Sequence, residues 1–307
     1  MMRRVALTAL ALWSLSGVSA SMLAAQDGDA GNDADSGQRK HAKLKIRNFD
    51  HLEFDTVTGT YLGIASFYTK DSKVVIGNTK TGQEAVTTEI RLLIGGESFQ
   101  AGVVIPYHAT SRKAVAADNI IGGQDDVGDV RTHLKFVPLR HELFDLGGGL
   151  MLTFPGGGSE VGISSGSVEV LPFVTGTAHA GPVDVNAHVG FNYVNHRDPA
   201  NGSAESVLYG GSVTMPVLET LGLRLELAGQ QFTGGGGLNV IAIEPGLDFM
   251  VPCGPIDLML SASAGYGLAG GAAGSNGKFG SQWGLNTKSG LSRGEWGAGM
   301  ALGVVWD

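Results

Sequence analysis

Apolar and polar side chains alternate with a period of two, in segments of about ten residues, along most of this chain. The clearest segment is 129–137, in which one face is apolar and the other is charged. The two faces are Val130, Thr132, Leu134 and Phe136 on one side, and Asp129, Arg131, His133 and Lys135 on the other. The segments 183–193, 221–228 and 296–306 alternate in the same way. Because successive side chains of a β-strand point to opposite faces, the pattern predicts an all-β chain whose strands have two unlike faces.

The connections between these segments alternate in length. About twelve strands are expected, near 59–69, 85–95, 99–108, 129–138, 143–154, 166–178, 182–193, 205–216, 221–232, 239–250, 255–266 and 295–306. Short turns such as 96–98 and 217–220 alternate with long connections near 70–84, 109–128, 155–165, 194–204, 233–238 and 267–294. Outer-membrane barrels combine an even strand count with tight turns at one end and long loops at the other. We therefore predict a transmembrane antiparallel up-and-down β-barrel of about 12 strands.

The alternation alone does not say which face is outside. In lipid, a sheet must close on itself so that every backbone group is paired, and its apolar face then meets hydrocarbon. A soluble sandwich would instead bury the apolar face and turn the charges outward. The export signal, the loop lengths and the aromatic chain end favour the membrane barrel over a soluble secreted β-protein.

The amino-terminal residues have the features of an export signal. Arg3 and Arg4 precede the apolar run 5–13, and small residues follow at 18–20, so 1–20 is predicted to be a signal peptide. The apolar run falls short of the ~20 residues that a membrane anchor needs. Residues 21–55 are polar and lack periodicity, which predicts a disordered periplasmic leader. The barrel is expected to occupy 56–307.

Composition excludes several other classes of protein. Glycine accounts for 49 of 307 residues but keeps no G-X-Y period, so a collagen helix is excluded. A single cysteine leaves no disulfide framework. The net charge is −8, and because residues 1–20 contain two arginines and no acid, their removal lowers it to −10. That balance argues against nucleic acid as a partner and favours cations or neutral solutes.

Charged and imidazole side chains on the polar face are expected to line the barrel interior. The predicted lumen-lining residues are Glu89, Arg91, Asp129, Arg131, His133, Lys135, Glu169, Asp184, His188, Arg224, Glu226, Glu244, Asp248 and Asp257. Mixed signs on neighbouring strands favour internal salt bridges. Such charges either line a conducting path or pair and fill the interior, and the sequence leaves both alternatives open.

Three strings of this sequence resemble a family of outer-membrane proteins named after the meta-pathway of phenol degradation. They are Gly-Asp-Val-Arg-Thr-His-Leu-Lys at 128–135, Leu-Thr-Phe-Pro-Gly-Gly at 152–157, and Ser-Gly-Ser-Val-Glu-Val-Leu-Pro at 165–172. Their order and spacing are similar to those of the family, and the resemblance covers roughly 55–307. It implies an outer-membrane β-barrel transporter for small hydrophobic or aromatic compounds. The chain departs from the usual aromatic end by closing on Trp306-Asp307.

Sequence patterns associated with catalysis carry little weight here. Residues 265–270 match GxGxxG and 162–166 match the nucleophile-elbow pattern, but neither has the helix that such a motif needs. An outer-membrane hydrolase needs Ser and His adjacent on an outer face, whereas 108–110 is His-Ala-Thr. The histidines are scattered, so neither a metal site nor a cofactor is expected, and the protein is not expected to be an enzyme.

The function predicted from these features is a channel or transporter for passive uptake of small molecules. The alternatives are a closed structural or receptor-like barrel that presents its loops to partners, and, more remotely, a barrel hydrolase. The expected partners are outer-membrane lipid, small solutes, and the barrel-assembly machinery acting on the carboxyl-terminal strand, where the penultimate Trp306 takes the aromatic role.

Overall fold

Thirteen strands make up the regular structure of the described residues. The computed structural model describes residues 53–76, 79–113, 124–156, 168–195, 205–232, 239–269 and 296–306. The predicted signal peptide and residues 21–52 of the predicted leader lie outside these described residues. The strands are β1 Thr60–Ile76, β2 Thr79–Gly95, β3 Phe99–Lys113, β4 Gln124–Val127, β5 Val130–Arg140, β6 Phe144–Phe154, β7 Val168–Ala180, β8 Val183–Asn195, β9 Ser206–Pro216, β10 Leu221–Phe232, β11 Asn239–Cys253, β12 Ile256–Ala269 and β13 Trp296–Trp306.

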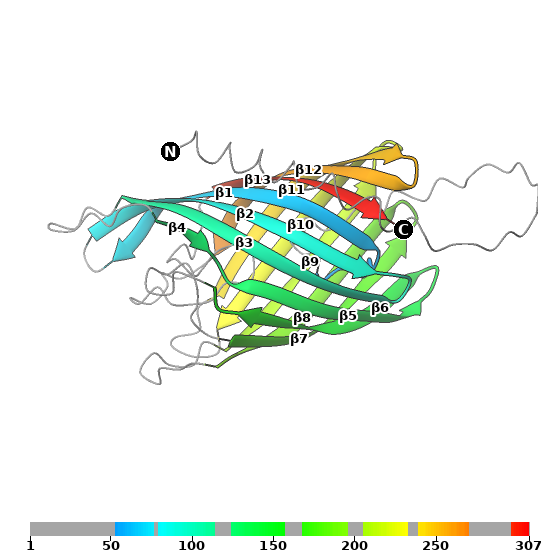
Figure 1. The fold of residues 1–307 in the computed structure, drawn as a ribbon, viewed down its shortest axis with the longest axis horizontal. Coiled ribbons are helices and arrows are strands. Elements are labelled where there is room, and N and C mark those ends of the chain that lie inside the picture. The colour runs from blue at the N-terminus through cyan, green and yellow to red at the C-terminus, as the bar shows by residue number, and fades with distance from the viewer. Residues whose placement is uncertain are drawn as a thin grey trace, which may run out of the picture. The chain divides into compact units, whose positions relative to one another are not determined.

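Twelve of these strands close into an antiparallel barrel (Figure 1). Each long strand pairs with the next one along the chain, and β13 returns to pair with β1, from Thr60 opposite Trp306 to Lys70 opposite Trp296. The short β4 pairs with β3 beyond the point where β3 pairs with β5. The prediction of an all-β barrel of about twelve strands is confirmed. In the described part of the chain, no helix is long and apolar enough to cross a membrane.

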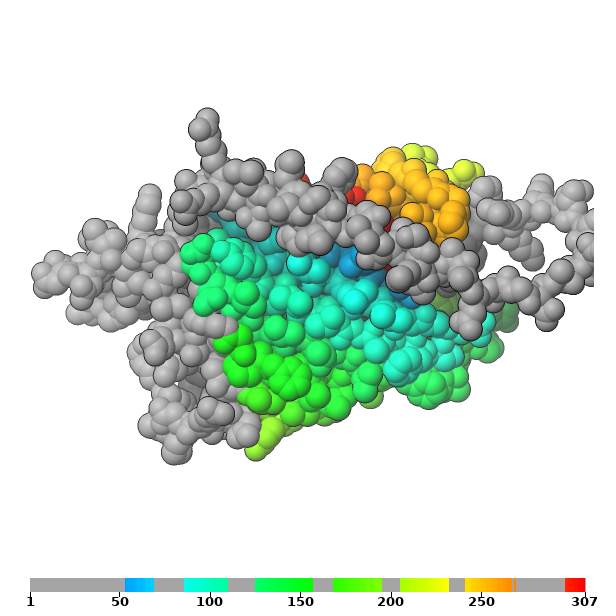
Figure 2. Space-filling model, in the orientation of Figure 1, coloured from blue at the N-terminus to red at the C-terminus, as the bar shows by residue number. Residues whose placement is uncertain are grey.

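The two faces of the barrel wall differ as the alternation predicts. On β5, Leu134 and Phe136 are more than half exposed, whereas Lys135 between them is fully buried. The outward side chains of the other strands are also large and apolar, among them Leu223, Leu225 and Leu227 on β10. Figure 2 shows the near side of the wall as a continuous surface of side chains. An apolar exterior around a charged interior is the arrangement that a barrel in lipid requires.

Two connections expected to be long loops are partly strand. β1 continues to Ile76 and β2 begins at Thr79, so most of 70–84 forms a hairpin beyond the barrel (Figure 1). Its register shifts between Asp71 and Val74. The polar residues of this stretch suggested a loop, but β-branched residues are well represented on both arms and favour extended backbone. Likewise, β3 runs on to Lys113, and β4 occupies part of 109–128.

Five short turns lie at one end of the barrel, which we call the turn end. They join consecutive strands at 96–98, 141–143, 181–182, 217–220 and 254–255. Gly181 and Gly254 adopt positive φ angles of 66° and 78°, a conformation that glycine reaches without strain. Both termini of the strand order, Thr60 of β1 and Trp306 of β13, pair at this same end.

Candidate functional site

The residues immediately before β1 lie inside the barrel. We call 53–59 the plug segment. Glu53, Phe54, Asp55, Thr56 and Thr58 in it are all buried, with at most 4% of each residue exposed. The expected boundary between leader and barrel lies at 55/56, so the last three residues assigned to the leader are folded against the barrel wall. The segment enters at the turn end, where it continues into β1.

Two carboxylates of the plug segment pair with cations on β5. Asp55 Oδ1 accepts a hydrogen bond from Lys135 Nζ at 2.9 Å, and Lys135 also donates to the carbonyl of Val57 at 2.7 Å. Glu53 Oε1 lies 3.6 Å from Arg131 Nη2. Buried charges need such partners because an unpaired one keeps its full desolvation penalty. The plug acids and the β5 cations therefore hold each other in place.

Phe54 anchors the plug segment through apolar contacts. Its ring meets Phe173 of β7 edge-on at 4.8 Å between centroids, and stacks on His188 of β8 at 5.2 Å. The backbone carbonyl of Phe54 accepts a hydrogen bond from Thr175 Oγ1 at 2.5 Å. Around these rings lies a buried apolar cluster that also contains Met151, Leu171, Leu208 and Ala228. The cluster joins side chains of β6, β7, β9 and β10 inside the barrel.

Arg140 forms hydrogen bonds with the plug segment at the turn end. Its guanidinium donates to the carbonyl of Thr56 at 3.0 Å and to Thr58 Oγ1 at 2.9 Å. The same group donates to the carbonyl of Glu97 at 2.6 Å and to Asp145 Oδ2 at 2.9 Å. One side chain thus ties the plug segment to the β2–β3 turn and to β6, using the forked donor geometry of arginine.

Thirteen of the fourteen predicted lumen-lining residues lie on strands with their side chains on the inner face, and Asp129 lies in the break between β4 and β5. Eleven of the fourteen are buried, and Asp184, Glu244 and Asp257 are half-buried. On β2, the Arg91 guanidinium donates to Glu89 Oε2 at 2.6 Å, and Arg131 of β5 donates to Glu89 Oε1 at 3.0 Å. Further round the wall, Arg224 of β10 pairs with Glu226 and, at 2.9 Å, with Asp248 of β11.

The remaining predicted residues take separate positions. Glu169 Oε2 accepts from Asn192 at 3.1 Å, and His133 Nε2 lies 3.4 Å from Gln100 Oε1. Asp184 lies at the turn end, with Oδ1 2.8 Å from His179 Nδ1. The set therefore does not form one centre. It forms two ion-pair clusters, one on β2 and β5 and one on β10 and β11, with single residues between them.

Both sides of the barrel wall carry charges of both signs, with cations prominent on β5 and carboxylates on β11. Arg131 and Lys135 line β5, and Glu244 and Asp248 line β11, which is six strands from β5 in either direction round the ring. The plug segment brings its two acids to the β5 side. Eight carboxylates and four cations occur among the predicted lumen residues, and the plug adds two more carboxylates, so the interior is net negative.

Two of the sequence strings that carry the family resemblance meet at the end of the barrel opposite the turns. The amide of Gly128 donates to the carbonyl of Pro106 at 2.8 Å, which fixes the break between β4 and β5. Asp129 Oδ1 accepts from the amide of Gly156 at 3.2 Å. A Cβ at Gly156 would lie 2.0 Å from the carbonyl oxygen of Gly128, so only glycine fits there. The Gly-Asp and Pro-Gly strings are thus two halves of one backbone junction.

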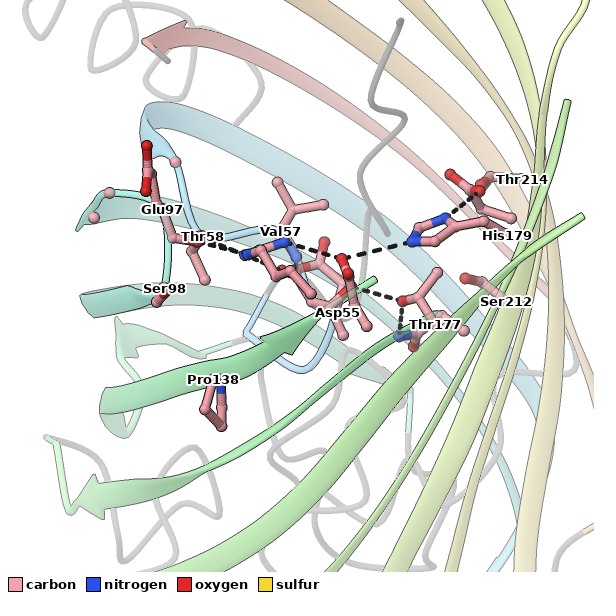
Figure 3. Close-up of a pocket in the computed structure, with 18 residues that line it drawn as sticks. Asp55, Val57, Thr58, Glu97, Ser98, Pro138, Thr177, His179, Ser212 and Thr214 are labelled. Atoms are coloured by element: carbon pink, nitrogen blue, oxygen red, sulfur yellow. Dashed lines mark hydrogen bonds and ion pairs between the residues drawn. The ribbon is translucent and has the colours of Figure 1, made fainter. Parts of the chain in front are cut away.

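A cavity of about 640 Å³ lies at the turn end between the plug segment and the wall. Figure 3 shows Asp55, Val57 and Thr58 on one side of it, and Thr177, Ser212 and Thr214 of β7 and β9 on the other. Asn186 and Asp184 of β8 complete this polar wall. The Thr56 and Thr177 hydroxyls, 2.7 Å apart, join the plug to β7. The cavity is therefore bounded on one side by the plug segment itself.

Sequence reasoning missed the plug segment, Arg140 and the inward apolar residues. The only signal for the plug is the acid–aromatic–acid order of Glu53, Phe54 and Asp55 directly before β1. His108, considered for a hydrolase, faces the interior and its Nδ1 lies 2.8 Å from Thr87 Oγ1. Among the described residues, no group of three or more His, Cys, Asp or Glu is arranged to hold a metal ion.

Comparisons with known proteins add the following. No protein-family model matches the chain, and neither does any curated protein. The COG4313 outer membrane channel from Pseudomonas putida F1 has a similar structure, with a TM-score of 0.56 at 12% identity over 85% of this chain and 100% of the channel. The transport unit of the autotransporter AIDA-I from Escherichia coli scores 0.49 at 10% identity, covering 86% and 94%. The NanC porin scores 0.46 at 11% identity, covering 80% and 99%. By its likeness to the first of these, the chain has the fold of an outer-membrane barrel of known structure.

Proposed function

We propose that this protein is a bacterial outer-membrane channel for the passive uptake of small molecules, narrowed by its own plug segment. The observation that carries the proposal is the position of the plug segment inside the barrel. Lys135, Arg131 and Arg140 hold the segment there. Within the described residues, the plug segment is held by ion pairs, hydrogen bonds and aromatic contacts, none of them covalent. A segment held in this way restricts a lumen without sealing it permanently.

The proposed orientation places the turn end in the periplasm. Barrels of this class have short periplasmic turns and longer external loops, with both chain ends inside. A signal peptide at 1–20, outer-membrane lipid around the apolar wall, and recognition of β13 by the barrel-assembly machinery belong to the same proposal. Membership of the family named after the meta-pathway of phenol degradation is proposed on the three sequence strings.

The chemistry of the interior favours cations and neutral polar solutes over hydrophobic ones. Within the described part of the chain, buried polar and charged residues outnumber buried apolar ones by 29 to 18. The net negative charge of the interior lowers the energy of a cation in the lumen relative to an anion. Hydrophobic or aromatic compounds, which the family resemblance implies, would find apolar contacts mainly around Phe54 and Phe173.

The test is conductance of the refolded, full-length protein in a planar bilayer. A gradient of potassium chloride gives the reversal potential, and we expect potassium to permeate more readily than chloride. A liposome-swelling panel of sugars, amino acids and phenols then ranks the solutes. Absence of channels from correctly folded protein would contradict the proposal, and a preference for chloride would contradict its electrostatic part.

The filled interior favours a second candidate, the closed structural or receptor-like barrel. Besides the cluster around Phe54, a second apolar cluster of Tyr61, Leu93, Met259 and Val305 lies within the barrel. Folded protein that conducts no ions, with or without the plug segment, would support this candidate. We propose no catalytic role; hydrolysis of outer-membrane phospholipid that His108→Ala abolishes would point to the hydrolase instead.

A further inference from the structure

We propose that the cavity at the turn end is a binding site for a neutral polyhydroxylated solute of about monosaccharide size. The cavity volume of about 640 Å³ falls within the range of small-molecule sites, roughly 300–1,000 Å³. The biological role of this binding site rests on the proposed channel function, because the bound solute would be one that is passing through the channel. The site itself is a property of the folded barrel and is testable without conduction.

Six hydroxyl side chains of the described residues line the cavity. Thr56 and Thr58 of the plug segment, Ser98 of the β2–β3 turn and Thr177, Ser212 and Thr214 of the wall all line the cavity, together with the Asn186 amide. Figure 3 shows Thr177, Ser212 and Thr214 gathered on the wall that faces the plug segment. Among the described residues, the His179 imidazole is the only aromatic ring that lines the cavity. Such a surface can exchange hydrogen bonds with a polyol but gives a hydrophobic ring nothing to stack on.

Two buried polar atoms of the lining have no hydrogen-bond partner within the described residues. They are the Ser212 hydroxyl oxygen and Asp55 Oδ2. Ser212 is 6% exposed and Asp55 is 3% exposed, so both residues are more than nine-tenths buried. A buried polar atom without a hydrogen bond is destabilising, because it has lost its contact with water and gained no partner. A ligand that donates to Asp55 Oδ2 and shares a hydrogen bond with the Ser212 hydroxyl would relieve that destabilisation.

Three of the carboxylates that line the cavity have a basic partner. Asp55 Oδ1 is paired with Lys135, and Asp145 Oδ2 with Arg140. Asp184 Oδ1 lies against His179 Nδ1. Four carboxylates and one guanidinium line the cavity, so an anionic solute would be repelled. Because Asp55 and Asp145 already have cationic partners, a ligand needs hydroxyl donors and no ammonium charge of its own.

Saturation-transfer NMR on the full-length protein in detergent micelles tests the assignment. The probes are D-glucose, D-glucosamine and D-glucuronate, which share one ring and differ in charge at pH 7. We expect saturable binding of glucose, weaker binding of glucosamine and none of glucuronate. Ser212→Ala should weaken glucose binding about fivefold, the usual worth of one hydrogen bond. Thr214→Val, at a second position in the same lining, should also weaken it.

The matched control is Ser263→Ala. Ser263 lies on β12, and its buried hydroxyl also has no partner within the described residues, but it does not line this cavity. This variant should bind glucose as the parent does. A heat-dependent shift in gel mobility confirms that each variant is folded before it is titrated.

Several results would overturn the proposal. No saturable binding to folded protein, tightest binding of glucosamine or of glucuronate, or equal loss in Ser212→Ala and Ser263→Ala would each do so. The proposed function fails separately. Conductance without glucose binding would remove this site and leave the channel, whereas glucose binding without conductance would leave the site in a closed barrel.

Discussion

Lys135 is the residue that contributes most to holding the plug segment inside the barrel. Lys135→Met leaves the buried Asp55 carboxylate without its cation and removes the bond to the Val57 carbonyl. Breaking a buried pair by removing one partner costs about 3–5 kcal/mol, so we expect the plug segment to detach more often. Single-channel recordings should show a larger mean conductance, and the urea midpoint should fall.

A double variant serves as the control for this prediction. Lys135→Met with Asp55→Asn removes the uncompensated charge as well, so part of the lost stability should return. Conductance and urea midpoint that stay at the parent values in Lys135→Met alone would mean that this ion pair does not hold the plug segment.

Selectivity also belongs to individual residues. Glu244 and Asp257 are half-buried on the inner face, so their charge is less masked than that of buried pairs such as Arg224 and Asp248. Glu244→Gln with Asp257→Asn should lower the potassium-to-chloride permeability ratio by about twofold, seen as a smaller reversal potential. Glu142→Gln with Glu219→Gln removes the same charge from exposed turns and should change it much less. Equal shifts in the two double variants would place the selectivity outside the lumen.

Single residues are also where sequence reasoning is least complete. Alternation placed Arg131, His133 and Lys135 on one face of β5, because a period of two depends only on local geometry. It could not place Glu53 and Asp55 against them, because those contacts join a short irregular segment to a strand about 80 positions away. It also could not identify Met151, Leu171 and Leu208 as residues that face the interior. In the sequence, an apolar residue on an otherwise polar face cannot be told from an irregularity in the alternation.

Among the elements, the junction of β3, β5 and β6 sets a strict requirement on Gly156. In Gly156→Ala, the new Cβ would lie 2.0 Å from the Gly128 carbonyl oxygen, so β5 or the chain after β6 must move. Overpacking of this kind costs about 1–3 kcal/mol. The fraction of heat-modifiable, folded protein after refolding should fall, and the urea midpoint with it.

Gly96 provides the comparison for that variant. It lies in the β2–β3 turn, and a Cβ there would meet nothing within 4 Å. Gly96→Ala should therefore refold as the parent does. If both glycine variants refold equally well, the junction tolerates a side chain and the account of the Gly-Asp and Pro-Gly strings is wrong.

Two outward-facing tryptophans on the last strand, β13, lead to a prediction on assembly. Trp306 faces outward at the turn end of β13 and Trp296 faces outward at the opposite end of the same strand. We expect Trp306→Ala to lower the amount of barrel assembled in the outer membrane of cells severalfold, while refolding into detergent is unchanged. Trp296→Ala should have a smaller effect in cells. The opposite order would exclude Trp306 as the aromatic that the assembly machinery recognises.

Strand positions were predictable and strand extensions were not. Nearly every expected strand overlaps an observed one to within a few residues, because lipid on one side and a polar interior on the other impose alternation over the whole membrane span. Beyond the membrane this constraint ends. The sequence of β1 and β2 past Tyr68 alternates poorly, although the backbone pairing continues to Ile76 and Thr79.

At the scale of the whole molecule, two features combine: a wall whose outer face is apolar, and an interior largely occupied by side chains and by the plug segment. The first follows from the sequence, since twelve strands with one apolar face cannot remain open in lipid. The second could not be predicted from the sequence, because filling depends on how the inner side chains meet across the barrel. Among the lumen charges, Arg91 and Arg131 both pair with Glu89, while Glu244 and Asp257 stay half-exposed.

The most direct measurement of the central claim compares two proteins in the same planar bilayer. One is the full-length chain, and the other lacks residues up to Thr58, so that it begins at Gly59 directly before β1. Both are first shown to be folded by their heat-dependent gel mobility. Our account predicts that the shortened barrel has the larger single-channel conductance. Equal conductances, or no conductance from either folded protein, would contradict it.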